Sequence, residues 1–292
     1  MRSSCGSDPW FVAGYRRQQD GMASAPRSVV PTEQRVRHEM LDEGHRLVDA
    51  ARSEGLTLRL LGGLAVREHC SSLELCERDY SDLDMVVPAK QARRLASLFA
   101  GFGYAENVAV SMATANAELQ FVRPCRHAGR PGVGSAHADD HIDVFLGTFH
   151  MDHDIALERR LEIEPYTVSL SDLLLTKLQI FRLEEKDLRD IVTLLGDADV
   201  GDEDAPGAIN GRYIGRLCAD DWGLFYDVAM NLHRTDERAA TFDLSAAQAA
   251  RLRHGIVRLI AAIDGAPKSL RWRLRARVGT RKRWHSALDG QE

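Results

Sequence analysis

One stretch, residues 58–87, constrains the fold more than any other part of the chain. It contains two short apolar runs that have the length of buried strands. A pair of glycines ends the first run, a helical pattern follows, and a pair of aspartates opens the second run. In sequence order these features are 58–61, Gly62-Gly63, 64–69, Asp82-Leu83-Asp84 and 85–87. The order predicts a strand, a tight turn, a helix and a second strand, as at the beginning of an α/β sheet.

The two glycines suit the approach of a large anion. Gly62 and Gly63 carry no Cβ, so the backbone can turn sharply and a triphosphate can come close to it. A helix that begins there would direct its free N–H groups and the positive end of its dipole at the phosphates. Ser81, just before the aspartate pair, could donate to the phosphates as well. The alternatives are a glycine turn without a ligand, and a serine that only begins the strand.

The aspartates suit divalent cations. Asp82 and Asp84 lie two residues apart on a predicted strand, so both carboxylates project from one face. Neighbouring carboxylates repel each other unless hard cations such as Mg²⁺ share them. Asp143 lies between Ile142 and Val144, where an aspartate is costly unless it is paired, metal-bound or facing a cleft. The alternative for Asp143 is an edge strand that exposes it to water.

These residues also carry a family resemblance. Gly-Gly-Leu-Ala at 62–65, followed after a helix by Ser-Asp-Leu-Asp at 81–84, resembles the signature of the polymerase-beta-type nucleotidyltransferase superfamily. The resemblance extends over residues 56–195. It implies a glycine loop that holds the triphosphate of an NTP, and an Asp82/Asp84 pair that binds two Mg²⁺ or Mn²⁺ ions with Asp143 as the third carboxylate. The implied reaction moves an NMP onto an acceptor hydroxyl or phosphate and releases pyrophosphate.

A second resemblance lies in the pair of helices predicted at 173–183 and from 187 onward. Lys177 and Asp190, with Asp187 as an alternative to Asp190, are similar to a segment of the abortive-infection (AbiEii-like) toxin nucleotidyltransferases. That similarity implies that the lysine contacts the triphosphate and that an aspartate supports the site. The arginine-serine spacing before Asp82 departs from those toxins. The alternative is a solvated face with charge pairs three and four residues apart.

The alternation of strands and helices predicts an α/β (α+β) fold: a small mixed sheet flanked by helices, then a C-terminal helical region. We expect residues 1–31 to be disordered, 32–196 to form the nucleotidyltransferase domain, 196–207 to be a linker, and 208–292 to be helical with a basic tail. Helices are expected at 32–54, 89–100, 208–218, 221–233 and 245–263. Strands are expected at 104–110, 118–122 and 142–146, a strand or hairpin within 155–168, and loops at 70–80 and 124–140.

The composition of the chain limits its expected location and binding partners. A net charge of −5 provides no overall attraction to nucleic acid or membranes. No apolar run approaches the length that spans a bilayer, and the N-terminus lacks the apolar segment of a signal peptide. The scattered cysteines contain no C-x-x-C and are typical of reduced cytosolic thiols; they are Cys5, Cys70, Cys76, Cys125 and Cys218. We therefore expect a cytoplasmic protein without a membrane partner.

Two further clusters of residues are candidate binding sites. Histidines and aspartates alternate between 137 and 154, but they match no tetrahedral zinc spacing cleanly and we expect a solvated loop. They are His137, Asp139, Asp140, His141, His150, Asp152, His153 and Asp154. The second cluster is the tail, where eight Lys/Arg fall between 268 and 283 without an acid, beside Trp272 and Trp284. Such a tail could bind RNA, or the tryptophans could pack on the core while the arginines face water.

The sequence does not determine which molecule accepts the NMP. Toxin-type members of the superfamily imply RNA, particularly a tRNA 3′ end, together with a cognate antitoxin protein as partner. Antibiotic-modifying members imply a small molecule such as an aminoglycoside or lincosamide. An acceptor with amines would need an acidic pocket, whereas RNA would need the basic tail near the site. A module that binds nucleotide without turnover is the alternative of another class.

Overall fold

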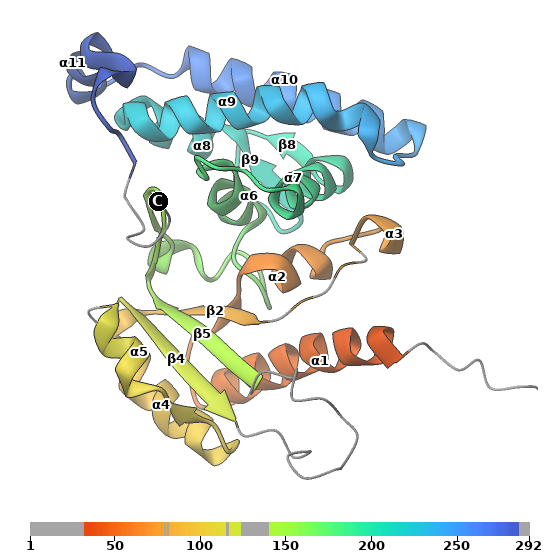
Figure 1. Cartoon of the computed structure of the whole chain (residues 1–292), viewed down its shortest axis with the longest axis vertical. Coiled ribbons are helices and arrows are strands. Elements are labelled where there is room, and N and C mark those ends of the chain that lie inside the picture. The colour runs from red at the N-terminus through yellow and green to blue at the C-terminus, as the bar shows by residue number, and fades with distance from the viewer. Residues whose placement is uncertain are drawn as a thin grey trace, which may run out of the picture.

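The computed structural model describes residues 32–76, 78, 80, 82–114, 117–123 and 140–285. Several features expected from the sequence lie outside these residues: the disordered segment 1–31, Ser81, His137 and Asp139, Cys5 and Cys125, and nearly all of the loop 124–140. The described chain forms two lobes, one built on a sheet and one built from helices, with α2 (Gly62–Glu68) and α3 (Leu73–Cys76) between them (Figure 1). We refer to them as the sheet lobe and the helical lobe.

The sheet lobe contains five strands in the order β1-β2-β5-β4-β3. β2 and β5 run parallel, and the other neighbours are antiparallel, so the sheet is mixed as predicted. The strands are β1 (Arg59–Leu60), β2 (Leu83–Val87), β3 (Ala105–Glu106), β4 (Glu118–Arg123) and β5 (Asp140–Leu146). The antiparallel pair β4 and β5 pins the centre of the sheet over six residue pairs.

The two faces of this sheet differ in polarity. Met85, Ile142 and Val144 project from one face and are at most 1 % exposed. Figure 1 shows α1 (Thr32–Ser53) and α4 (Ala92–Gly101) covering that side of the sheet, and leucines and valines of α1 belong to the same core. Because side chains alternate along a strand, Asp84 and Asp143 project from the opposite face, which is turned toward the helical lobe.

The helical lobe begins with two helices that we predicted within the first domain. α6 (Leu170–Leu178) starts at Ser169, whose hydroxyl accepts from the Asp172 N–H, and α7 (Glu185–Asp197) follows. Both pack with α8 (Gly211–Asp220), α9 (Trp222–Arg238) and α10 (Ala246–Gly265). α10 begins with a capping box formed by Ser245 and Gln248. The helix flanks and the C-terminal helical region therefore confirm the predicted fold class.

Three predicted elements differ in the structure. The strand expected at 104–110 is wrong beyond β3: α5 (Val108–Ala113) follows, with Val108 and Met112 exposed and Ser111 buried, so the apolar residues do not enter a core. The hairpin lies earlier than 155–168, as β6 (Thr148–His150) paired with β7 (Asp154–Ala156). The expected linker at 196–207 contains β8 (Asp199–Gly201), which pairs in parallel with β9 (Ala208–Asn210) and buries Val200.

The cysteine prediction is wrong for one pair. Cys70 and Cys76 form a disulfide, while Cys218 is a buried free thiol. The loop expected at 70–80 contains α3, which folds the chain back so that the two Cα atoms lie 6.6 Å apart, within reach of a disulfide. In the described part of the chain, no helix combines the length and the hydropathy that a membrane crossing requires.

The tryptophans of the basic tail point inward. Trp272, on α11 (Leu270–Val278), packs edge-on against Phe225 with 5.2 Å between ring centroids. Trp284 donates from its indole nitrogen to both carboxylate oxygens of Asp227, at 3.1 and 3.0 Å, and packs against Tyr226 at 4.9 Å. Asp227 is fully buried and also bonds His153 at 2.7 Å. The structure thus supports the packing alternative for both tryptophans.

We expect Trp284→Ala to lower the free energy of unfolding by about 2–4 kcal/mol, because it removes buried aromatic surface and one donor to the buried Asp227 carboxylate. Urea unfolding followed by circular dichroism measures this change. Arg277→Ala, exposed on α11, is the control and should change stability by less than about 0.5 kcal/mol. Equal stabilities of the two variants would mean that the tail does not pack as described.

Candidate functional site

Acidic side chains gather on the polar face of the sheet. Asp84 and Asp143 are direct partners in the parallel β2–β5 register, and Asp82 lies one residue before β2. Asp82, His141 and Asp143 can each offer one ligand atom, and these atoms all lie within 4.8 Å of one another. The structure therefore brings together Asp82 and Asp143 from the predicted set, with His141 beside them as a further candidate ligand. Asp84 stands beside this group rather than in it.

A chain of hydrogen bonds orients Asp143. The Gln120 side-chain amide donates to Asp143 Oδ1 at 2.9 Å, and the Asn107 amide donates to Gln120 Oε1 at 2.9 Å. Gln120 is the register partner of Asp143 across the β4–β5 ladder, so the bond follows from the strand pairing. The other oxygen, Oδ2, lies 3.7 Å from His141 Nε2. One carboxylate oxygen is thus held by protein, and the other is turned toward His141.

Asp84 lies under the glycine turn. Gly62 has a φ of +67°, and a Cβ at this position would collide with the Asp84 carboxylate. Glycine is therefore required both by its backbone conformation and by the close approach of the side chain below it. Burial, followed by the charge of Asp82, raises the pKa of Asp84 to about 7, although Lys177 opposes the shift.

Glu118 is an acid of this face that the sequence argument overlooked. It begins β4 two residues before Gln120, and burial together with Asp143 raises its pKa to about 7. Its position in the predicted strand 118–122, with a polar residue two places later, was the signal that could have revealed it. Asp143 therefore has an orienting amide and a further carboxyl group on its β4 side.

Three charged residues predicted from the helix pair do meet. Lys177 Nζ lies 3.1 Å from Asp187 and 3.0 Å from Asp190, so both competing aspartates bind it. Burial disfavours the ammonium, but Asp190 and Asp187 outweigh burial and raise the pKa of Lys177. The charge of Lys177 also opposes the rise in the pKa of Asp84.

Arg78 is a second cation that the sequence argument did not single out. Its Nη2 bonds Asp190 at 2.9 Å, and its guanidinium lies 4.6 Å from the Tyr80 ring centroid. A Cβ at Gly63 would collide with this guanidinium, so the space beside Gly63 holds a positive charge. The buried Nε of Arg78 has no hydrogen-bond partner. The signal in the sequence was an arginine four residues before Asp82.

The described histidines of this cluster, His141, His150 and His153, do not converge on one another. His150 pairs with Asp154 at 2.8 Å on the β6–β7 hairpin, and His153 reaches Asp227 of α9. Asp152 accepts from the Phe181 N–H at 2.8 Å. His141 alone among the described histidines of this cluster joins the carboxylates of the sheet.

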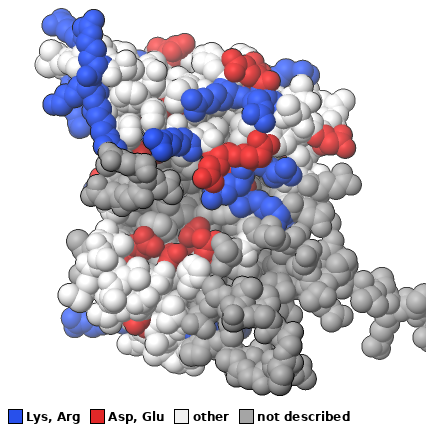
Figure 2. Space-filling view, in the orientation of Figure 1, with Lys and Arg blue, Asp and Glu red and all other residues white. Residues whose placement is uncertain are grey.

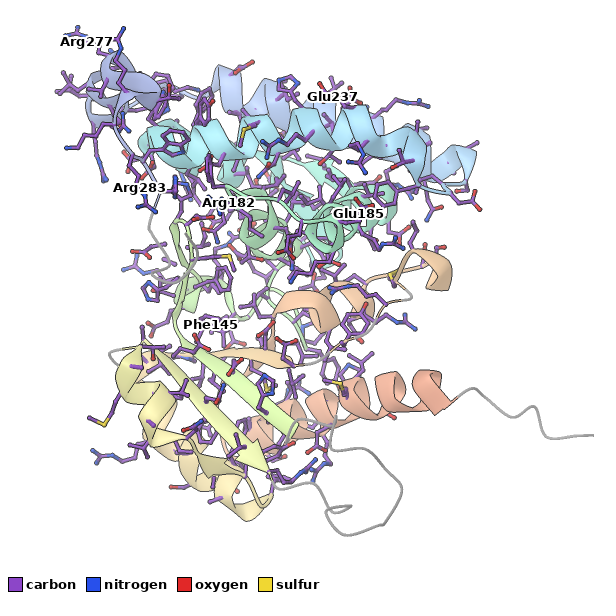
Figure 3. The ribbon with its side chains drawn as sticks, viewed as in Figure 1. Phe145, Arg182, Glu185, Glu237, Arg277 and Arg283 are labelled. Carbon is purple, nitrogen blue, oxygen red and sulfur yellow. A yellow bond between two sulfur atoms is a disulfide. The ribbon has the colours of Figure 1, made fainter. Side chains whose placement is uncertain are left out.

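Charged side chains lie on the facing parts of the two lobes. Figure 2 shows acidic side chains along the edge of the sheet lobe, and both Lys/Arg and Asp/Glu side chains on the facing part of the helical lobe. In Figure 3, Phe145 of β5 lies on the sheet-lobe side, and Arg182 and Arg283 lie across from it. Arg182 is exposed, in the segment between α6 and α7.

Comparisons with known proteins return limited similarity. No protein-family model matches the chain, and no curated protein matches it. A solution structure of the antibiotic-resistance factor ANT(2'')-Ia aligns with 82 % of this chain and 93 % of its own, at 11 % identity and a TM-score of 0.33. A nucleotidyltransferase-like protein from Paracoccidioides brasiliensis aligns with 80 % and 95 %, at 12 % identity and a TM-score of 0.40. Because the identities and TM-scores are this low, function has to be inferred from the geometry of the site.

We expect the melting temperature of the metal-free protein to fall as pH rises from about 4 to about 7. The pKa of Asp84 is 3.8 ordinarily and about 7 in the folded protein, so its protonation favours the folded state below the ordinary value. That stabilisation is lost as pH rises through the folded pKa. Asp84→Asn should flatten this fall in thermal melts in EDTA. Asp154→Asn, exposed on β7, should keep the wild-type slope, and an equal slope in all three proteins would contradict the assignment.

Proposed function

We propose that the chain is a metal-dependent nucleotidyltransferase that transfers an NMP from an NTP to an acceptor hydroxyl and releases pyrophosphate. One observation carries the proposal: the Asp82/His141/Asp143 group shares its sheet face with Asp84, which interacts with the charge of Lys177, and Arg78 lies against Gly63, next to the glycine that covers Asp84. Metal ligands and phosphate-binding cations are the two parts that phosphoryl transfer requires, because its catalysis is positioning and charge stabilisation.

The donor set fits divalent cations. Asp82 and Asp143 would hold the metal through carboxylate oxygens, and Asp84 is placed to serve a second Mg²⁺ or Mn²⁺ ion. Bound metal would polarise the α-phosphate and lower the pKa of the attacking hydroxyl. Gln120 keeps Asp143 in one orientation. Asp84, whose pKa is raised by burial and Asp82, would ionise fully when a cation neutralises the site.

The cations suit the triphosphate. Lys177 is mostly buried, with its side chain 13 % exposed, and two aspartates keep it charged and in place. Arg78 lies against Gly63 with an unpartnered buried Nε. Phosphate oxygens would accept from that nitrogen and balance both cations. The approach of a triphosphate to Gly62 and Gly63 stays a prediction; in the structure Gly62 makes room for Asp84, and Gly63 makes room for Arg78.

For the acceptor we propose a small polyhydroxylated molecule that carries amines. Glu118 adds a carboxyl group beside Asp143, and an amine would neutralise it. RNA is less favoured because Trp272 and Trp284, the stacking platforms expected of the tail, are engaged with Phe225 and Asp227. An RNA acceptor, with or without a cognate antitoxin, is the other outcome of the labelling experiment below.

The test is transfer of label from [α-³²P]NTPs, with Mg²⁺ or Mn²⁺, to a panel of aminoglycosides and lincosamides or to total tRNA. We expect label on an amine-bearing small molecule, and a loss of at least about 100-fold in Asp82→Asn and Asp143→Asn. Asp154→Asn is the matched control and should transfer normally. Label on tRNA would mean that the acceptor is RNA and not a small molecule. Absence of transfer with intact NTP binding would mean that the protein is a nucleotide-binding module without turnover.

Lys177→Met should weaken NTP binding by about 10-fold or more while acceptor affinity is retained, since a charge-assisted contact to phosphate is lost. Isothermal titration with a non-hydrolysable NTP measures the first quantity. Lys186→Met, an exposed lysine paired with Glu184, is the control. A variant that loses acceptor affinity instead would place Lys177 on the acceptor side.

A further inference from the structure

His141 occupies an unusual place among the acids. It lies two residues before Asp143 on β5, so both side chains project from the polar face of the sheet. The neighbouring strand brings Asp82 to the same end, because Leu83 is the register partner of Ile142. An imidazole is thus placed by the strand pairing alone between two carboxylates from different strands.

The imidazole is half-buried and lacks a hydrogen-bond partner among the described residues. Its side chain is 25 % exposed, and its Nε2 lies 3.7 Å from Asp143 Oδ2, which is longer than a hydrogen bond. Asp143 Oδ1 is already held by Gln120. An imidazole nitrogen of His141, one carboxylate oxygen of Asp143 and one carboxylate oxygen of Asp82 lie within 4.8 Å of one another.

We propose that His141 is a direct ligand of the metal ion held by Asp82 and Asp143, and that its imidazole makes this site select Mn²⁺ over Mg²⁺. The inference rests on the proposed function, because it concerns the same metal centre. Mg²⁺ prefers oxygen ligands and gives up its water reluctantly. Imidazole nitrogen binds first-row transition metals well, and Mn²⁺ accepts carboxylate oxygen as well as nitrogen. Replacing one oxygen by nitrogen therefore costs Mg²⁺ more than Mn²⁺.

The experiment uses the full-length protein and Mn²⁺ as the probe. Electron spin-echo spectroscopy of bound Mn²⁺ detects coupling to nearby ¹⁴N, and the coupling is larger for a nitrogen in the coordination sphere than for a more distant one. We expect ¹⁴N modulation in the wild type and in His150→Asn, the control on the β6–β7 hairpin, and its loss in His141→Asn. Mn²⁺ affinity, measured from the free-ion signal, should fall at least about tenfold in His141→Asn. Mg²⁺ affinity, measured by competition, should change less than about threefold.

The outcomes separate this inference from the proposed function. Loss of Mn²⁺ binding in Asp82→Asn, together with unchanged ¹⁴N modulation in His141→Asn, would overturn the role of His141 and leave the metal centre in place. An equal loss of Mn²⁺ and Mg²⁺ in His141→Asn, with wild-type protein lacking ¹⁴N modulation, would reduce His141 to a residue that positions Asp143. Unchanged Mn²⁺ binding in Asp82→Asn would overturn the metal centre itself. Circular dichroism of each variant confirms that the fold is retained.

Discussion

The parallel pairing of β2 with β5 is the constraint on which the rest of the site depends. It makes Asp84 and Asp143 direct neighbours, on a sheet whose opposite face is closed by α1 and α4. The carboxylates cannot turn away from each other into that core, so their charge has to be compensated on the polar face. Protonation, cations of the helical lobe and divalent metal are the available means, and the raised pKa of Asp84 reflects the first of them.

The cations that face these acids come from different parts of the chain and share one partner. Lys177 lies on α6 and Arg78 follows α3, and both bind the buried Asp190 of α7. A buried carboxylate between two cations gives each a defined position, whereas an exposed ion pair would contribute little. The site therefore contains two cations that are paired with Asp187 and Asp190 of α7, in addition to the carboxylates of the sheet.

The sequence was sufficient to predict the features that depend on local chemistry. The glycine pair, the aspartate pair, the polar position in β5, and the capped helices at Ser169 and Ser245 were all recognisable from residue type and spacing. The predictions were wrong where contacts with neighbouring elements determine the secondary structure of a short segment. Residues 108–113 form a helix because the apolar side chains there find no core, and residues 199–201 form a strand because β9 lies beside them.

The sequence by itself determined the order of strand, glycine turn, helix and acidic strand, because the periodicity of side chains and the freedom of glycine at Gly62 are local properties. Only the tertiary structure decided which residues meet. His141 lies beside Asp82. Asp143 is bordered by Glu118 and Gln120. Arg78 fills the space beside Gly63. These contacts follow from strand register and from the packing of α6 and α7 against α2, and neither is encoded in spacing along the chain.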